Sequence, residues 1–126
     1  MIIELILSTA LFVSDLMSKV SGSKKETKTA ISADLEKIAE TLEKVAHSLQ
    51  AGQYPHGACQ MMHELADQFI DKIGPYLDSE TSQKLAADLH ESANVERLFA
   101  EKTDMTVDKI KIAAGRFLAA ALLVKY

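Results

Sequence analysis

Apolar residues recur along most of this chain at the spacing of α-helices. The clearest pattern lies between residues 29 and 51, where apolar positions alternate steps of four and three. This spacing produces one narrow apolar seam along a helix, as in helical bundles and coiled coils. The seam comprises Ile31, Leu35, Ile38, Leu42, Val45 and Leu49. We therefore expect a long amphipathic helix whose Glu- and Lys-rich side faces solvent.

A second amphipathic helix is expected from residue 55 to residue 73. Its apolar positions are Ala58, Met62, Leu65, Ala66, Phe69 and Ile73. Before it, Gly52 is suited to end the preceding helix and Pro55 to begin this one. Only Gln53 and Tyr54 separate Gly52 from Pro55. So short a connection predicts an antiparallel hairpin of the two helices.

The C-terminal half predicts two further helices. Gly74 and Pro75 stop the preceding helix, and we expect Tyr76 and Leu77 to fold back onto the core. The next helix begins near residue 78, and its apolar period slips at Asn94. A kink or break is therefore expected at Asn94, before a short segment at 95–102. The last helix, from about 103 to 124, turns inward Val107, Ile110, Ala114, Phe117, Ala121 and Val124.

The N-terminal residues 2–20 also have a helical pattern, but they are apolar on most of the helix circumference. The narrow polar stripe consists of Glu4, Ser8, Asp15 and Lys19. A helix of this kind must be covered on most of its sides. The small and polar residues 21–28 that follow predict a loop or flexible linker.

These elements predict an all-α protein, a compact helical bundle of four to five helices. The 126 residues, 48% of them hydrophobic and 25% charged, favour a single globular domain with its own core. We expect this domain, residues 1–126, to consist of an apolar helix at 1–20, a polar linker at 21–28 and the rest of the bundle at 29–126.

The first and last helices carry more apolar surface than a small bundle covers easily. No polar residue interrupts the sequence from Phe117 to Val124. We expect the two helices to pack at the centre of the bundle, and the excess surface to contact a second copy or another protein. The expected contact residues are Ile3, Leu5, Phe12, Leu118, Leu122 and Leu123. This interpretation makes the protein a non-enzymatic interaction or regulatory module.

A membrane-docked function is the alternative, in which the N-terminal helix lies in a bilayer interface. Lys24, Lys25 and Lys28 would then meet anionic lipid. The polar side of the helix carries almost no basic residues, which argues against this alternative. The segment lacks the basic start of a signal peptide, and Glu4 and Asp15 interrupt it as a membrane span. A cytoplasmic location is therefore expected.

Histidine and cysteine residues at the start of the second helix are the strongest candidates for chemistry. His56, Cys59 and His63 fall at positions i, i+3 and i+7 at the edge of the apolar face, with Asp67 one turn later. Imidazole and thiolate bind Zn, Cu and haem iron, so the three residues form a candidate metal or haem site. The simpler interpretation makes Cys59 a half-buried apolar residue and the histidines boundary residues. Because His47 on the preceding helix should face solvent, no fourth ligand is apparent, and no cofactor is expected.

The remaining sequence features exclude several classes of function. The net charge of −4 and the lack of a basic stripe argue against a nucleic-acid partner. A single cysteine cannot form an internal disulfide, so the fold does not depend on an oxidising compartment. No phosphate-binding loop or pair of catalytic groups is present, and an enzyme is not expected. We interpret His90 and Glu91 as isolated surface residues.

Overall fold

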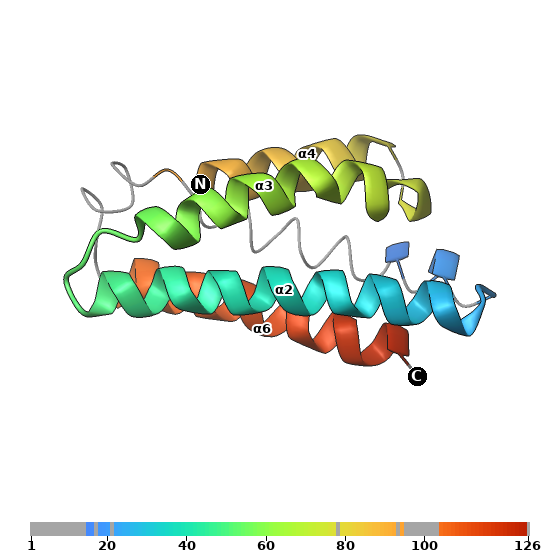
Figure 1. Ribbon diagram of the computed structural model, residues 1–126, viewed down its shortest axis with the longest axis horizontal. Coiled ribbons are helices and arrows are strands. Elements are labelled where there is room, and N and C mark those ends of the chain that lie inside the picture. The colour runs from blue at the N-terminus through green and yellow to red at the C-terminus, as the bar shows by residue number, and fades with distance from the viewer. Residues whose placement is uncertain are drawn as a thin grey trace.

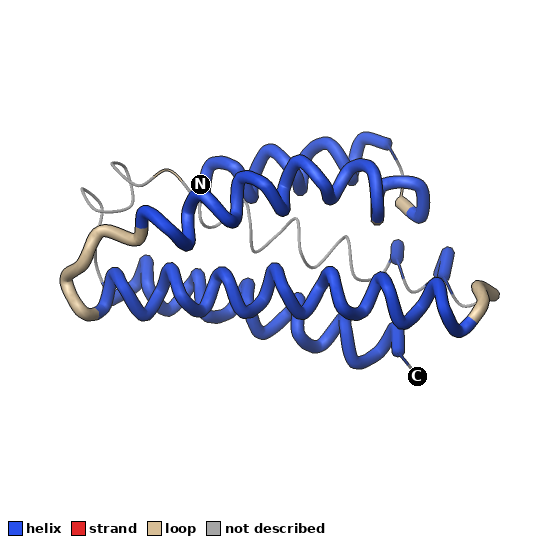
Figure 2. Tube along the Cα trace, viewed as in Figure 1, coloured by secondary structure: helices blue, strands red, loops and turns tan. Residues whose placement is uncertain are grey.

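The computed structural model describes residues 15–16, 18–20, 22–77, 79–92, 94 and 104–125 (Figure 1). Its main elements are α2 (Lys25–Gln50), α3 (His56–Lys72), the short 3-10 helix η1 (Gly74–Tyr76), α4 (Ser79–Ser92) and α6 (Asp104–Lys125). The described residues form helices and turns, with no strand among them (Figure 2). The predicted all-α bundle is confirmed.

The helices are arranged as two pairs. The most extensive packing joins α2 to α6, and α3 packs on both α4 and α2. Within each pair the two helices run side by side in opposite directions, so that α2 and α6 form one layer and α3 and α4 the other (Figure 1). The predicted hairpin of α2 and α3 therefore joins the two layers.

The connection between α2 and α3 follows the prediction from its glycine and proline. Gly52 has φ 75°, in the left-handed region that glycine adopts at little cost. The Gly52 amide donates to the Leu49 carbonyl (3.1 Å) and the Gln53 amide to the Ser48 carbonyl (2.8 Å), which closes the end of α2. α3 then begins at His56, directly after the buried Pro55.

The start of α2 differs from the expected one. The helix begins at Lys25, inside the segment 21–28 that the composition predicted as a linker. Lys24 provides no side-chain cap, but Glu26 lies in the first turn, where a carboxylate interacts favourably with the helix dipole. Lysine and glutamate are also good helix formers. Within the described residues, only the turn at 22–24 remains of the expected linker.

The boundaries after α3 agree with the sequence pattern. Leu77 is buried and Tyr76 is partly buried against the core, as the fold-back after Pro75 required. α4 ends at Ser92, and Asn94 lies outside the helix, which confirms the predicted break. The short segment expected at 95–102 lies outside the described residues.

The core is formed by the faces that the periodicity predicted. All six seam residues of α2 and all six inward residues of α6 are buried. Alanines on both helices add small buried side chains to this layer, at Ala39, Ala46, Ala113, Ala114, Ala120 and Ala121. Within it the Ser32 hydroxyl donates to the Ala121 carbonyl over 2.8 Å, a buried hydrogen bond between α2 and α6. Small side chains thus allow the two helices to pack closely.

The N-terminal helix was expected to pack with the last helix at the centre. Leu16 and Val20, at its C-terminal end, are buried. Residues 1–14 lie outside the described part of the chain, so the central placement stays a prediction. α6 is buried on one side and exposed on another, and the expected contact residues Leu118, Leu122 and Leu123 lie on the exposed side.

Candidate functional site

The exposed side of α6 is the most unusual surface of the described chain. Six large apolar side chains are exposed among the described residues, and four of them belong to this helix. Their exposed fractions are 48% for Ile112, 47% for Leu118, 49% for Leu122 and 54% for Leu123. Gly115 and Ala119 are exposed between them. We name the six residues Ile112, Gly115, Leu118, Ala119, Leu122 and Leu123 the outward α6 face.

This face follows from the second half of α6, where Arg116 is the single charged residue between Ile112 and Val124. One side of α6 packs against the core, and the opposite side retains apolar residues that no other described element covers. The centre of the face is a stripe of Ile112, Gly115, Ala119 and Leu122. At 3.6 residues per turn the stripe spans an arc of about 80°. It therefore forms one continuous apolar ridge with small residues in the middle.

Gly115 has no role in the fold that would explain it. A Cβ atom placed on it would meet nothing within 4 Å, and its φ is not positive. A glycine inside a helix costs about 0.5–1 kcal/mol relative to alanine. The described structure therefore carries this cost without a packing reason for it.

Half of the predicted contact residues can be placed. Leu118, Leu122 and Leu123 lie on the outward α6 face, whereas Ile3, Leu5 and Phe12 lie outside the described residues. The sequence interpretation missed Ile112. The signal was present, because Ile112 shares a side of the helix with Leu122, ten residues later.

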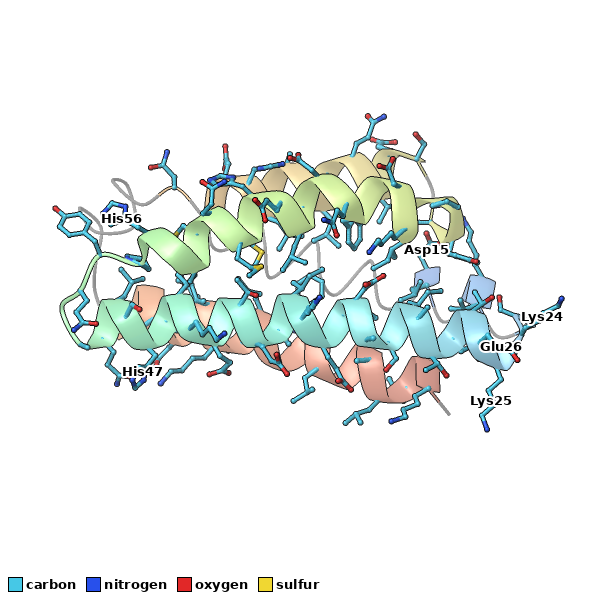
Figure 3. The ribbon with its side chains drawn as sticks, in the orientation of Figure 1. Asp15, Lys24, Lys25, Glu26, His47 and His56 are labelled. Carbon is cyan, nitrogen blue, oxygen red and sulfur yellow. The ribbon has the colours of Figure 1, made fainter. Side chains whose placement is uncertain are left out.

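The candidate metal ligands point in different directions. His56 is exposed and stacks on Tyr54, with ring centroids 5.5 Å apart, and it lies at the start of α3 (Figure 3). Cys59 is buried, and desolvation raises the pKa of its thiol to about 11. His63 is half-buried and contacts His90 of α4.

The three residues are not brought together around one point. His56 and His63 are seven residues apart, which is about 10 Å along a helix axis, so one ion cannot bind both. Among the described residues, no group of three or more His, Cys, Asp or Glu is placed to hold a metal ion. The expected solvent exposure of His47 is found, on the side of α2 turned away from α3 (Figure 3).

A different cluster joins α3 to α4. The Nδ1 atoms of His63 and His90 are 2.8 Å apart, and the two rings stack with centroids 5.0 Å apart. The Nε2 atom of His90 lies 2.9 Å from Oδ1 of Asp67. We name these three residues the His63–His90–Asp67 cluster. Its hydrogen bonds link one turn of α3, from His63 to Asp67, with the last turn of α4.

The interpretation of His90 as an isolated surface residue is wrong. α4 packs antiparallel on α3, and this packing places His90 against a histidine 27 residues earlier. A signal was available in the sequence. Positions 63 and 90 are equally distant from the centre of the connection at Tyr76 and Leu77, as opposite positions of a helical hairpin are.

One hollow lies between α2 and α3. It is lined by Asp34, Ile38, Leu65, Gln68, Phe69, Lys72 and Ile73. Its empty volume of about 210 Å³ includes space open to solvent, and ligand pockets begin at about 300 Å³. Lys72 Nζ lies 3.7 Å from Oδ1 of Asp34 at this hollow. The hollow is therefore smaller than the pockets that usually bind drug-sized ligands.

None of the described helices combines the length and the apolar character needed to cross a bilayer. No family model, curated protein or solved structure matches the chain.

Proposed function

We propose that this protein is a non-enzymatic interaction module that self-associates through the outward α6 face. The observation that carries this proposal is the set of four large apolar side chains, each about half exposed, on one side of one helix. Continuous exposed apolar surface of this kind marks contact sites on soluble proteins. The single buried cysteine needs no oxidising compartment, and we place the module in the cytoplasm.

The spacing of the central stripe favours a second copy as the partner. Its steps of three, four and three residues read the same in both directions. A two-fold axis midway between Gly115 and Ala119 therefore opposes Gly115 to Ala119 of the second copy and Ile112 to its Leu122. In such an isologous contact the same patch serves both subunits. Small residues would lie where the helices cross, and large residues on either side would interdigitate.

The unexplained glycine supports the same arrangement. Gly115 would allow two α6 helices to approach closely at their crossing point, because it has no side chain to separate them. The cost of glycine in a helix would then be offset by contacts in the dimer. This argument is independent of the exposed leucines, because it rests on the backbone of α6.

Sedimentation velocity on the full chain tests the proposal. We expect wild-type protein to sediment as a concentration-dependent dimer. Leu122→Glu and Gly115→Leu should sediment as monomers, the first because it buries a charge and the second because it separates the helices. The matched control is Met61→Glu, which replaces a side chain of similar exposure, 47%, on α3. This variant should remain dimeric.

Two results would overturn the proposal. A wild-type monomer at all accessible concentrations would exclude self-association, and dimers of unchanged affinity for both α6 variants would place the contact elsewhere. Far-UV circular dichroism of each variant shows whether it remains folded. Gly115→Leu is the more secure variant here, because open space surrounds the position in one chain.

An anionic membrane is the competing partner of the same face. α6 carries Lys109, Lys111, Arg116 and Lys125 but few acidic residues, and basic residues beside an apolar face favour anionic lipid. Flotation with phosphatidylserine vesicles separates the two partners. A wild-type monomer that floats with vesicles, and a Leu122→Glu variant that does not, would replace self-association with membrane docking.

A further inference from the structure

We propose that His63 and His90 form a binding site for a divalent transition-metal ion of the Cu(II) or Ni(II) type. Their Nδ1 atoms would be the two protein ligands, and Asp67 would orient His90. The site lies on α3 and α4 and does not depend on the outward α6 face. It also differs from the expected set of His56, Cys59 and His63, with which it shares one residue.

Asp67 sets the tautomer that a metal ligand needs. Its carboxylate accepts a hydrogen bond from Nε2 of His90 over 2.9 Å. A neutral His90 that donates from Nε2 keeps its lone pair on Nδ1. This lone pair faces Nδ1 of His63. Histidines that bind metals commonly donate the other ring N–H to a carboxylate in this way. The second shell of the site is therefore already in place.

The two nitrogens are close enough to bind one ion after a small rotation of each ring. Two nitrogens about 2.0 Å from a metal are about 2.8 Å apart at a right angle and about 3.3 Å apart at a tetrahedral angle. The observed separation is 2.8 Å. This is the separation of a direct hydrogen bond, and with the ring centroids 5.0 Å apart the two Nδ1 atoms face each other, so each ring must turn before both lone pairs point at one ion. Cu(II) and Ni(II) are the expected ions on the donor type, because imidazole suits both and divalent affinities rise through Ni(II) to Cu(II).

A bound metal ion would replace the hydrogen bond between the two histidines, because both interactions use the two Nδ1 atoms. In the free protein one Nδ1 donates its proton to the other over 2.8 Å. When the ion binds, His63 takes the tautomer with its proton on Nε2, so both Nδ1 atoms can donate lone pairs without a net change of protons. The hydrogen bond holds the two rings close together before the ion arrives, which reduces the cost of ordering them.

The surface around the cluster is accessible and acidic. The side chains of His90 and Asp67 are 35% and 75% exposed, so an ion reaches them from solvent. Glu64 and Glu91, which follow the two histidines, are exposed as well, and acidic residues raise the local concentration of cations. The remaining coordination positions are open to water or to a donor from another molecule.

Titration of the full chain with Cu(II) tests the proposal, with affinity read by calorimetry and ligands by electron paramagnetic resonance. We expect one ion per chain and hyperfine splitting from two nitrogens. His63→Gln and His90→Gln should each weaken binding by more than about tenfold and leave one nitrogen in the spectrum. The matched controls are His47→Gln and His56→Gln, which should bind like the wild type.

Asp67→Ala tests the orienting role separately. This variant should keep both nitrogens in the spectrum and lose about tenfold in affinity, the effect typical of a lost second-shell partner. Unchanged affinity in His63→Gln or His90→Gln would overturn the proposal, and so would a loss in His56→Gln of the same size. Competition by Cys59 is small, because its thiol is buried and protonated at neutral pH.

Discussion

Cys59 shows how a single side chain can be read in two ways from sequence and in one way from structure. As a candidate metal ligand it would need a thiolate, whereas the structure buries it to 1% exposure at the inner edge of α3. Desolvation there raises the pKa of the thiol from 9.0 to about 11. Cys59 therefore behaves as a small apolar core residue.

The raised pKa of Cys59 predicts a loss of stability at alkaline pH. Below pH 9 the thiol is protonated in both the folded and the unfolded chain, so it adds no pH dependence. Between pH 9 and pH 11 the unfolded chain loses its proton first, and the free energy of unfolding falls as pH rises. The fall amounts to about 2 kcal/mol across this interval, because the difference in bound protons is incomplete at both ends of it.

Urea unfolding of wild-type and Cys59→Ala protein at pH 8, 9, 10 and 11 measures this effect. The Cys59→Ala variant keeps the titration of Lys and Tyr residues and lacks that of the thiol, so the difference between the two proteins isolates Cys59. We expect the stability advantage of the wild type to shrink above pH 9. A difference that stays constant from pH 8 to pH 11 would contradict the assignment.

At the scale of the elements, the hairpin of α2 and α3 depends on one backbone conformation. Gly52 has φ 75°, a value that costs an L-residue about 1–2 kcal/mol. Gly52→Ala should therefore lower the free energy of unfolding by about 1 kcal/mol. Chemical denaturation measures the change.

Gly57 provides a matched control for this substitution. It lies in the first turn of α3, a Cβ atom there would meet nothing within 4 Å, and its φ is not positive. Gly57→Ala should therefore leave stability unchanged or raise it by up to about 1 kcal/mol. Equal destabilisation by both substitutions would show that the conformation of Gly52 is not what holds the turn.

At the scale of the whole molecule, two adjacent methionines of α3 lie in different environments, one in the core and one at the surface. Met62 of α3 is fully buried within the core cluster, whereas Met61 is 47% exposed. Met62→Ala should destabilise the whole bundle by about 2–5 kcal/mol through the lost contacts and the cavity. Met61→Ala should change stability by no more than about 0.5 kcal/mol.

Denaturation followed by circular dichroism at 222 nm compares the two methionine variants, because the helical signal reports all the helices together. A single transition that shifts strongly for Met62→Ala alone would agree with one cooperative core shared by both layers. Similar midpoints for the two variants would show that the described packing of α3 is wrong.

The sequence by itself determined the helices, most of their boundaries and their inner faces. The seam of α2 and the inward residues of α6 are buried as predicted, because a period of 3.6 residues places apolar side chains on one side of a helix. Gly52 and the break at Asn94 were also predictable, since turn formation depends on a few neighbouring residues. The start of α2 was missed because Lys and Glu suit both a helix and a linker.

Only the tertiary structure decided which faces meet and which remain uncovered. The side-chain partners of His90 come from another helix, because the register of α3 against α4 brings it to His63 and Asp67. From Phe117 to Val124 α6 is apolar on all sides, and its packing on α2 determines that Leu122 faces solvent while Phe117 is buried. Periodicity describes the sides of one helix, whereas burial depends on contacts between residues far apart in the chain.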